Sequence, residues 1–193
     1  KEFKKIKYHL GGHKNEDIDW ADIIIRHQAI KPKNPFLQYA INKGKEIKTD
    51  VEIFLESVIP ENIIGVTGTK GKSTVSSLIY EVLKTTEKEV VLTGNIGKSV
   101  LDSLGSIGEN TLVVLEISSF QLESFDANEV SPKYAVITNI YPDHLNYYSS
   151  MDVYIAAKKL IGRHQTWNDF LLINKEDKIT NSTDFLSGVK SKI

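Results

Sequence analysis

The chain of 193 residues contains no cysteine and has no strong excess of charge of either sign. The absence of cysteine excludes disulfide bonds and thiolate metal sites, and it is compatible with a reducing compartment such as the cytoplasm. Lysine and arginine number 24 and aspartate and glutamate 25, so a strongly basic nucleic-acid-binding surface is not expected. No apolar run approaches the ~18 residues that a membrane-spanning helix needs, so we expect no membrane partner.

Hydrophobic residues make up 40% of the chain and charged residues 25%, which is typical of a soluble globular protein with enough apolar side chains for a core. Short β-rich runs alternate with amphipathic stretches, and the later runs are almost continuously apolar. The predicted strands are residues 21–25, 46–48, 63–67, 90–93, 112–115, 134–138 and 170–173, and the predicted helices are residues 35–43, 51–57, 73–84, 98–104, 119–125 and 151–162. Apolar runs of this kind are typical of a parallel sheet covered on both faces by helices. We therefore predict an α/β fold with a doubly wound, mostly parallel sheet, whose ligands bind at the C-terminal ends of the strands.

A domain boundary is expected near residues 58–61, where Pro60 follows a predicted helix and precedes a strand. Residues 1–59 hold only about two strand–helix pairs, which is few for an independent domain, and residues 60–193 hold the stronger alternation. The final segment, residues 180–193, is polar and carries no predicted strand. We therefore expect the chain to be the middle of a larger protein.

A glycine-rich segment at residues 65–73, Gly-Val-Thr-Gly-Thr-Lys-Gly-Lys-Ser, joins a predicted strand to a predicted helix. Such a turn directs backbone N–H groups and a helix N-terminus toward one point, which favours phosphate binding. Lys72 would reach the outer phosphates, and Ser73 would offer its hydroxyl to Mg²⁺. A strict Walker A motif requires a glycine where Val66 stands, and the Gly-Lys-Ser triplet alone also fits an ordinary turn and helix cap. The order of strand, turn and helix favours nucleotide binding. The expected nucleotide-binding residues are Gly68, Thr69, Lys70, Gly71, Lys72, Ser73 and Thr74.

Other polar residues follow later strands at their C-terminal ends. Asn95 comes directly after residues 90–93 and also fits a simple turn. Glu116 follows four apolar strand residues, where a carboxylate is costly to bury unless a cation or several donors meet it. It is therefore a candidate Mg²⁺ ligand opposite Ser73, with a helix cap or an ion pair as the alternative.

Two further candidates lie toward the C-terminus. His144, in Asn-Ile-Tyr-Pro-Asp-His, could bind a metal or a phosphoryl oxygen, or it could simply be an exposed loop histidine. Its neighbour Asp143 is interpreted as a turn residue or an orienting partner. Lys158 precedes a second lysine on a predicted helix, and this spacing by itself favours a solvated helix face.

Several of these segments, taken together, resemble the Mur ligase family of ATP-dependent, amide-forming enzymes. Thr67–Ser73 resembles the phosphate loop of that family, and the segments Gly94–Gly97, Leu115–Glu123, Asp143–Leu145 and Ala156–Lys158 follow in family order. The string Ser-Ser-Phe-Gln-Leu-Glu, which ends at Glu123, is similar to the branch that adds D-glutamate. Residues 21–25 through 50–54 are similar to the end of the N-terminal, Rossmann-like domain of that branch. The resemblance extends from about residue 15 to about residue 175.

The resemblance implies a reaction that joins D-glutamate to UDP-N-acetylmuramoyl-L-alanine with ATP and Mg²⁺, through an acyl-phosphate intermediate. A carboxylate is a poor electrophile until one of its oxygens becomes part of a phosphate leaving group, and this is the chemical reason for using ATP. The partners would be small molecules, and we expect a monomer. The family also has a third domain that contacts the amino acid. We expect residues 1–59 to be part of the UDP-substrate-binding domain, residues 60–193 to be the ATP-binding domain, and the chain not to complete the ligation alone.

The resemblance also assigns roles to particular residues. Lys72, His144 and Lys158 would be catalytic, and Asn95 and Ser118 would lie near the nucleotide and the muramoyl substrate. Lys158 matches a lysine that is carbamylated in the family, which turns a cation into an anion able to support a metal. The expected metal-binding residues are Ser73, Glu116, His144 and Lys158.

The sequence also departs from the family pattern. Lys70 stands where the family usually has asparagine, which adds a positive charge beside the phosphates. Residues 26–30, Arg-His-Gln-Ala-Ile, replace a segment that contacts the uridine nucleotide in the family. Two alternatives therefore stay open: another Mur or folylpolyglutamate synthase-like ligase, and a non-catalytic relative that binds nucleotide without turnover.

Overall fold

The computed structural model describes residues 6–193, which divide into two compact units between Thr49 and Asp50. The first unit holds helices α1 (Asn15–Trp20) and α2 (Pro35–Asn42) and strands β1 (Ile23–Ile25) and β2 (Glu46–Lys48). The two strands pair in parallel, as the crossover through α2 allows. Residues 1–5, which belong to the expected first domain, lie outside the described residues.

The second unit is built on five strands and six α-helices. The strands are β3 (Ile63–Thr67), β4 (Val90–Gly94), β5 (Leu112–Glu116), β6 (Tyr134–Ile137) and β7 (Phe170–Ile173). The helices are α3 (Asp50–Leu55), α4 (Lys72–Lys84), α5 (Val100–Ser103), α6 (Leu122–Ala127), α7 (Met151–Lys159) and α8 (Thr183–Leu186). Single 3₁₀ turns occur at Pro60–Asn62, Leu104–Ser106 and Leu160–Gly162.

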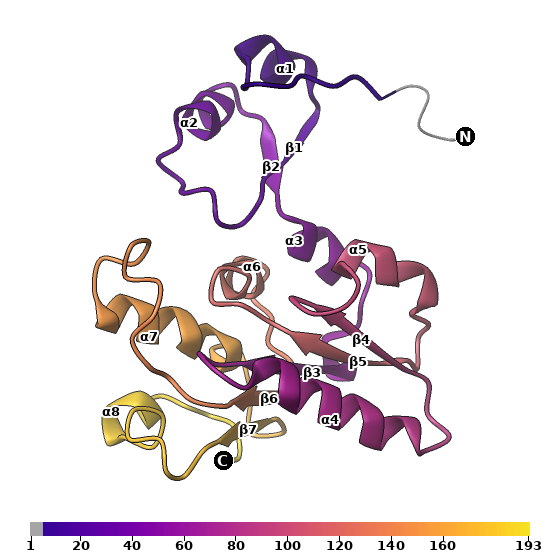
Figure 1. Ribbon diagram of the computed structural model, residues 1–193, viewed down its shortest axis with the longest axis vertical. Coiled ribbons are helices and arrows are strands. Elements are labelled where there is room, and N and C mark those ends of the chain that lie inside the picture. The colour runs from indigo at the N-terminus through magenta and orange to yellow at the C-terminus, as the bar shows by residue number, and fades with distance from the viewer. Residues whose placement is uncertain (1–5) are drawn as a thin grey trace. The chain divides into compact units, whose positions relative to one another are not determined.

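The five strands form one parallel sheet with the order β4-β5-β3-β6-β7. The chain enters at the central strand β3, adds β4 and β5 on one side, and then crosses to add β6 and β7 on the other (Figure 1). The strand order therefore reverses at β3, and a crevice opens at the carboxyl ends of strands beside such a switch point. The predicted α/β fold with a parallel sheet is confirmed.

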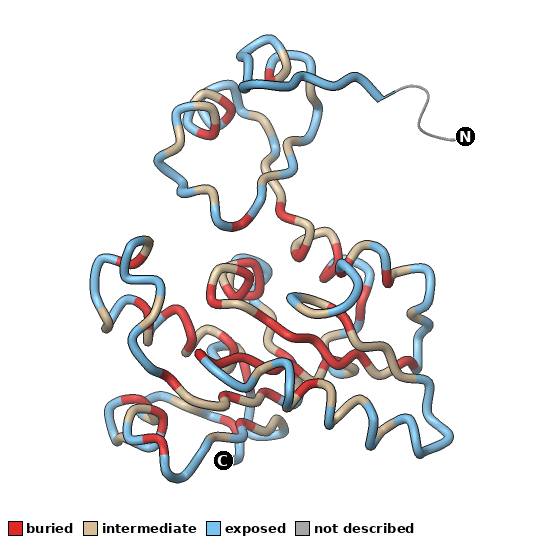
Figure 2. The backbone as a smooth tube through the Cα atoms, in the orientation of Figure 1, coloured by how far each residue is buried: buried red, intermediate tan, exposed pale blue. Residues whose placement is uncertain are grey.

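The hydrophobic core lies within the second unit, where buried residues follow one another along the strands (Figure 2). Its helical part comes mainly from α3, α6 and α7, through residues such as Phe54, Phe125 and Tyr154, which are 1% exposed or less. Because Phe54 belongs to this core, α3 packs with the second unit. The compact units therefore divide before α3, about ten residues earlier than the boundary expected near residues 58–61.

Helix α4 packs on β3, β4 and β5, and it buries fewer apolar side chains than its sequence indicates. Leu78 and Val82, which belong to the apolar stripe of this helix, are 60% and 65% exposed, and its one buried side chain is Ser76. Two short helices, α1 and α8, are absent from the prediction. Ser182 caps α8 by accepting a hydrogen bond from Phe185 N. Across residues 6–193, each helix is too short or too polar to cross a membrane.

Candidate functional site

The loop at residues 68–71 connects β3 to α4, and two of its glycines are required by its geometry. Gly68 has a φ of +146°, and a Cβ added there would stand 2.0 Å from Thr138 Oγ1. Gly71 has a φ of +80° and is the N-cap of α4. Glycine alone fits both conditions easily. The loop can therefore lie against the end of β6 and leave the first N–H groups of α4 without intrahelical partners, at the positive end of the helix dipole.

Asn139, in the segment after β6, holds the loop from one side. Its backbone oxygen accepts a hydrogen bond from Thr69 N at 2.9 Å, and its side-chain Oδ1 accepts one from Lys70 N at 2.9 Å. Its Nδ2 in turn donates to the Lys70 carbonyl oxygen at 3.0 Å. The backbone of Lys70 is thus fixed on both sides, while residue 70 as a whole is exposed. Sequence reasoning did not single out Asn139 itself.

Lys72 and Ser73 occupy the first turn of α4. Lys72 Nζ donates to the Thr69 carbonyl oxygen at 3.1 Å, so the side chain folds back over the loop. Ser73 and Thr74 are exposed. An ammonium group and a hydroxyl therefore lie beside the free amides at the start of the helix, an arrangement suited to an anion with a bound cation.

Glu116 is the last residue of β5, the strand beside β3, and its backbone is in register with Val66. The residue is 1% exposed. Its Oε1 accepts a hydrogen bond from Asn95 Nδ2 at 3.1 Å, and its Oε2 is buried without a hydrogen-bond partner among residues 6–193. Gly94 permits this arrangement, because a Cβ there would lie 2.2 Å from the Glu116 backbone oxygen. A buried carboxylate oxygen without a donor is costly, and a bound cation would satisfy it.

Lys158 is buried, with 1% of its surface exposed. Its Nζ donates to Thr67 Oγ1 and to the Gly68 carbonyl oxygen, each at 3.0 Å. The interpretation of Lys158 as part of a solvated helix face is therefore wrong. Spacing on α7 shows which residues share a helix face, but it does not show that this face packs against the loop.

The Lys158 amine shares its surroundings with three other charged side chains. Burial, together with the positive charge of Lys72, lowers the pKa of Lys158 to about 7. The carboxylates of Asp143 and Glu116 act in the opposite direction on this pKa. A large fraction of Lys158 is therefore a neutral, nucleophilic amine near neutral pH, unlike an exposed lysine.

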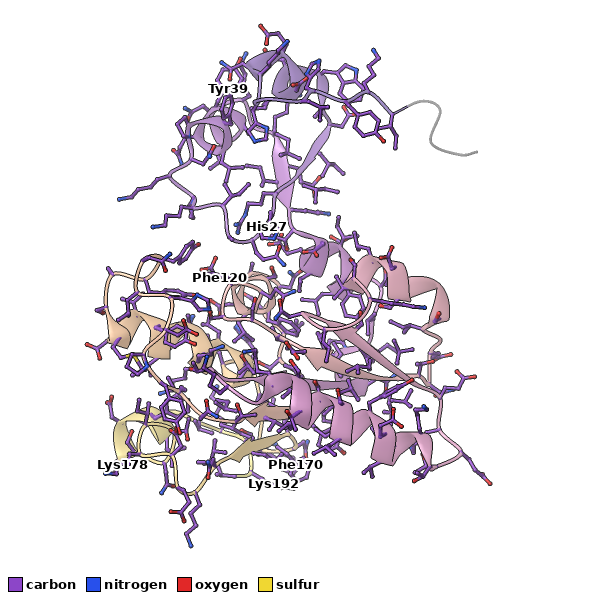
Figure 3. The ribbon with its side chains drawn as sticks, viewed as in Figure 1. His27, Tyr39, Phe120, Phe170, Lys178 and Lys192 are labelled. Carbon is purple, nitrogen blue, oxygen red and sulfur yellow. The ribbon has the colours of Figure 1, made fainter. Side chains whose placement is uncertain are left out.

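His144 lies in the loop after β6 with a φ of 52°, which is uncommon for a residue other than glycine. Its backbone N donates to Asp143 Oδ1 at 2.9 Å, and its Nε2 stands 3.8 Å from Asp143 Oδ2. Its imidazole packs against Phe120, with the ring centroids 5.1 Å apart. Phe120 is labelled in Figure 3 beside α6. The histidine side chain is 45% exposed, so its ring remains open to a ligand.

Ser118 lies in the turn before α6 and forms hydrogen bonds within that turn. Its backbone N donates to Gln121 Oε1 at 2.9 Å, and its Oγ accepts a hydrogen bond from Gln121 N at 3.3 Å. The Ser-Ser-Phe-Gln string therefore serves two structural purposes, because Ser118 and Gln121 close the turn before α6 with reciprocal hydrogen bonds and Phe120 packs against His144.

The structure brings Asn95 to Glu116, and Lys158 to the phosphate loop. Within residues 6–193, no three His, Cys, Asp or Glu side chains cluster as a metal cage. Magnesium needs few protein ligands when phosphate oxygens supply the rest, and the unpaired carboxylate oxygen of Glu116 has the chemistry of such a ligand.

Comparison with known proteins agrees with this geometry. Residues 66–192 match the family described as the Mur ligase middle domain. The chain is 40% identical over 174 residues to a UDP-N-acetylmuramoylalanine–D-glutamate ligase of Roseiflexus sp. (strain RS-1), covering 90% of the chain and 37% of that protein. It is 39% identical over 182 residues to the protein of the same name from Clostridioides difficile (strain 630), covering 94% of the chain and 40% of that protein. The chain thus spans well under half the length of these curated relatives.

Solved structures show the same fold. The chain matches a UDP-N-acetylmuramate:L-alanyl-gamma-D-glutamyl-meso-diaminopimelate ligase from Neisseria meningitides with a TM-score of 0.66 and 16% identity, covering 94% of the chain and 60% of that structure. It matches the MurF ligase of Thermotoga maritima in complex with ADP with a TM-score of 0.57 and 18% identity, covering 92% and 48%. The phosphate loop at the switch point and the matched residues 66–192 together lead to one assignment: the chain belongs to the Mur ligase middle-domain family.

Proposed function

We propose that the chain forms the ATP-binding, carboxyl-activating centre of an ADP-forming ligase that adds D-glutamate to UDP-N-acetylmuramoyl-L-alanine. The choice of amino acid rests on the relatives at about 40% identity, which are named for D-glutamate. The observation that carries the activity is Glu116, because its buried and unpaired carboxylate oxygen ends the strand next to the phosphate loop. Such an oxygen has a clear use as a ligand of a nucleotide-bound cation.

The phosphate loop would bind the outer phosphates of ATP. Lys72 would exchange its hydrogen bond to the Thr69 carbonyl for a charge-assisted bond to a phosphate oxygen, which is a stronger interaction. The amides at the start of α4 would bind the same group, and they need no reorganisation because the glycines already direct them. These groups would stabilise the charge on the phosphoryl group during transfer.

Ser73 and Glu116 would hold one Mg²⁺, and His144 together with a carbamylated Lys158 would support a second. The ions would supply charge neutralisation on the phosphate oxygens. The lowered pKa of Lys158 is compatible with carbamylation, because only a neutral amine adds CO₂. The hydrogen bond from Asn95 to Oε1 would leave Oε2 of Glu116 for the ion.

Catalysis would proceed in two displacements. A carboxylate oxygen of the alanyl group attacks the γ-phosphorus, the bond to the β–γ bridging oxygen breaks, and ADP leaves. The amine of D-glutamate then attacks the activated carbonyl carbon, inorganic phosphate leaves, and the amine nitrogen loses a proton. Asn95 and Ser118 would lie toward the muramoyl substrate, and the first unit would contribute to binding its uridine nucleotide.

The test is an ATP-dependent assay of the full-length protein with UDP-N-acetylmuramoyl-L-alanine and separate amino acids. We expect ADP release and product formation with D-glutamate and none with meso-diaminopimelate. Incorporation of diaminopimelate would replace the D-glutamate assignment with that of a sibling ligase. Nucleotide binding without ADP release for any amino acid would identify a non-catalytic relative.

Nucleotide binding is tested separately with a Lys72→Ala variant. Loss of the ammonium should weaken ATP binding by about 10- to 100-fold, because a charge-assisted hydrogen bond to phosphate is removed. Lys133→Ala, next to the first residue of β6, is the matched control and should bind ATP like the wild type. Equal affinities for the Lys72→Ala variant and the wild type would contradict the phosphate-loop assignment.

A further inference from the structure

Tyr154 makes a buried hydrogen bond to the phosphate loop that the proposed chemistry does not use. Its hydroxyl stands 3.1 Å from Thr69 Oγ1, and the two residues are 1% and 6% exposed. Water therefore cannot easily replace either partner, so loss of the Thr69 hydroxyl leaves the Tyr154 phenol unsatisfied, and loss of the phenol removes the bond from Thr69 to α7. Burial raises the pKa of Tyr154, so the phenol stays protonated and available as a neutral partner across the physiological range.

The Thr69 hydroxyl joins three segments of the chain. It pairs with Tyr154 on α7, and it also accepts a hydrogen bond from Tyr141 N, in the loop that carries His144, at 3.0 Å. The backbone oxygen of Thr69 accepts the hydrogen bond from Lys72 Nζ. Thr69 therefore contacts both Lys72 and the loop that carries His144.

Tyr154 and Lys158 lie four residues apart on α7 and so share one helix face. Both side chains contact the same loop, Tyr154 through Thr69 and Lys158 through Thr67 and Gly68. The ring of Tyr154 also lies close to the amine, with its centroid 5.5 Å from Lys158 Nζ. Helix α7 is thus attached to the phosphate loop at two successive points.

We propose that Tyr154 is a positioning residue for nucleotide binding, which acts through the Thr69 hydroxyl to fix the phosphate loop before ATP arrives. This inference rests on the proposed function. Preorganisation of the loop removes an ordering cost that would otherwise reduce nucleotide affinity. Without the Tyr154 hydroxyl, Thr69 keeps its hydrogen bond from Tyr141 N but loses the one to α7. The loop then samples positions that do not bind phosphate.

The experiment compares Tyr154→Phe, Thr69→Val and Thr69→Ser in the full-length protein, with ATP affinity measured by calorimetry and KM and kcat measured in the ligation assay. Tyr154→Phe keeps the ring and removes only the hydroxyl. It should weaken ATP binding about three- to tenfold and raise the KM for ATP by a similar factor, with a smaller change in kcat. Thr69→Ser, which keeps the hydroxyl, should bind ATP like the wild type. The double variant Tyr154→Phe/Thr69→Val should bind ATP no more weakly than Thr69→Val alone, because each substitution removes the same hydrogen bond between Tyr154 and Thr69.

Tyr148→Phe is the matched control, because Tyr148 is also buried and its hydroxyl makes no hydrogen bond to the phosphate loop among the residues that the structure describes. It should leave ATP affinity unchanged. ATP affinity within twofold of the wild type for Tyr154→Phe, or additive losses in the double variant, would overturn the inference, while loss of binding in Lys72→Ala would still support the proposed function. Failure of the unaltered protein to bind ATP would overturn the proposed function and this inference together. A lower melting temperature with unchanged ATP affinity would reduce Tyr154 to a packing role.

Discussion

The two ends of the five-stranded sheet differ in how they treat buried polar groups. At the carboxyl ends, Glu116 has a buried oxygen without a hydrogen-bond partner in the described part of the chain, and Lys158 is buried with a pKa of about 7. At the opposite end, Gln165 Nε2 donates to the carbonyl oxygens of Pro132, Lys133 and Phe170, and its unpaired atom is a neutral Oε1. In Figure 3, Phe120 and Phe170 mark these two sides.

The difference separates structural polar groups from functional ones. An uncharged amide with three acceptors stabilises the fold, whereas charged groups held without full partners have a cost that only a ligand relieves. The carboxyl end of the sheet therefore carries buried charged groups that reduce folding stability, as expected for a binding site. Three substitutions test this contrast.

The largest effect is expected for Glu116→Gln. The amide keeps the shape of the side chain and the hydrogen bond from Asn95 but lacks the charge that binds a cation. Ligation by the full-length protein should fall about 100- to 1000-fold, because a preorganised electrostatic contact is lost. The free energy of unfolding should be unchanged or higher, because a buried charge is removed. Glu61→Gln, in the 3₁₀ turn before β3, is the control and should alter neither quantity. Retained ligation by the Glu116 variant would contradict the contrast between the two ends.

Gly68→Ala should have the next largest effect, on folding stability. The added methyl would lie 2.0 Å from Thr138 Oγ1 at a φ of +146°, so the loop or the end of β6 must move. We expect a loss of about 2 kcal/mol or more in the free energy of unfolding, measured by urea denaturation. Gly105→Ala is the matched control, because nothing lies within 4 Å of its Cβ position. Equal stabilities for the two variants would show that the loop geometry is not constrained.

The smallest effect at each step of one pH unit is the pH dependence of stability contributed by Lys158. Its pKa is lowered to about 7 in the folded protein, so the unfolded chain binds more protons between about pH 7 and pH 10.5. Stability should therefore rise with pH in this window, by at most about 1.4 kcal/mol per pH unit. The Lys158→Met variant should lack this rise when both proteins are unfolded in CO₂-free buffer. If the free energies of unfolding of the wild type and the Lys158→Met variant differed by the same amount at every pH, the amine would have to be in contact with solvent.

The sequence predicts the scaffold well because apolar runs and glycines determine it locally. The strands Glu46–Lys48, Ile63–Thr67 and Phe170–Ile173 agree with the prediction to the residue. Helices α1 and α8 were missed because four to six residues give too short a periodicity to detect. Side-chain burial was harder to predict. The exposure of Leu78 and the burial of Lys158 depend on packing between elements that lie far apart in the sequence.

The candidate site shows the same division. Glu116 ends β5 and Asn95 follows β4, so both are detected by their position at strand ends. Their mutual hydrogen bond follows from the pairing of β4 with β5. Tyr154 and Asn139 have no motif of their own, and their contacts with the loop appear only in three dimensions. The spacing of Tyr154 four residues before Lys158 was the one available signal for it.

The close approach at Gly94 limits how this region can vary in evolution. Any side chain at that position would push against the backbone of Glu116, and the displacement would reach the neighbouring Asn95 as well. A single substitution outside every expected ligand set would thus disturb two functional groups at once. Natural variants of this protein should therefore keep glycine at position 94 even where the surrounding turn changes freely, and deep mutational scanning would show this position as intolerant.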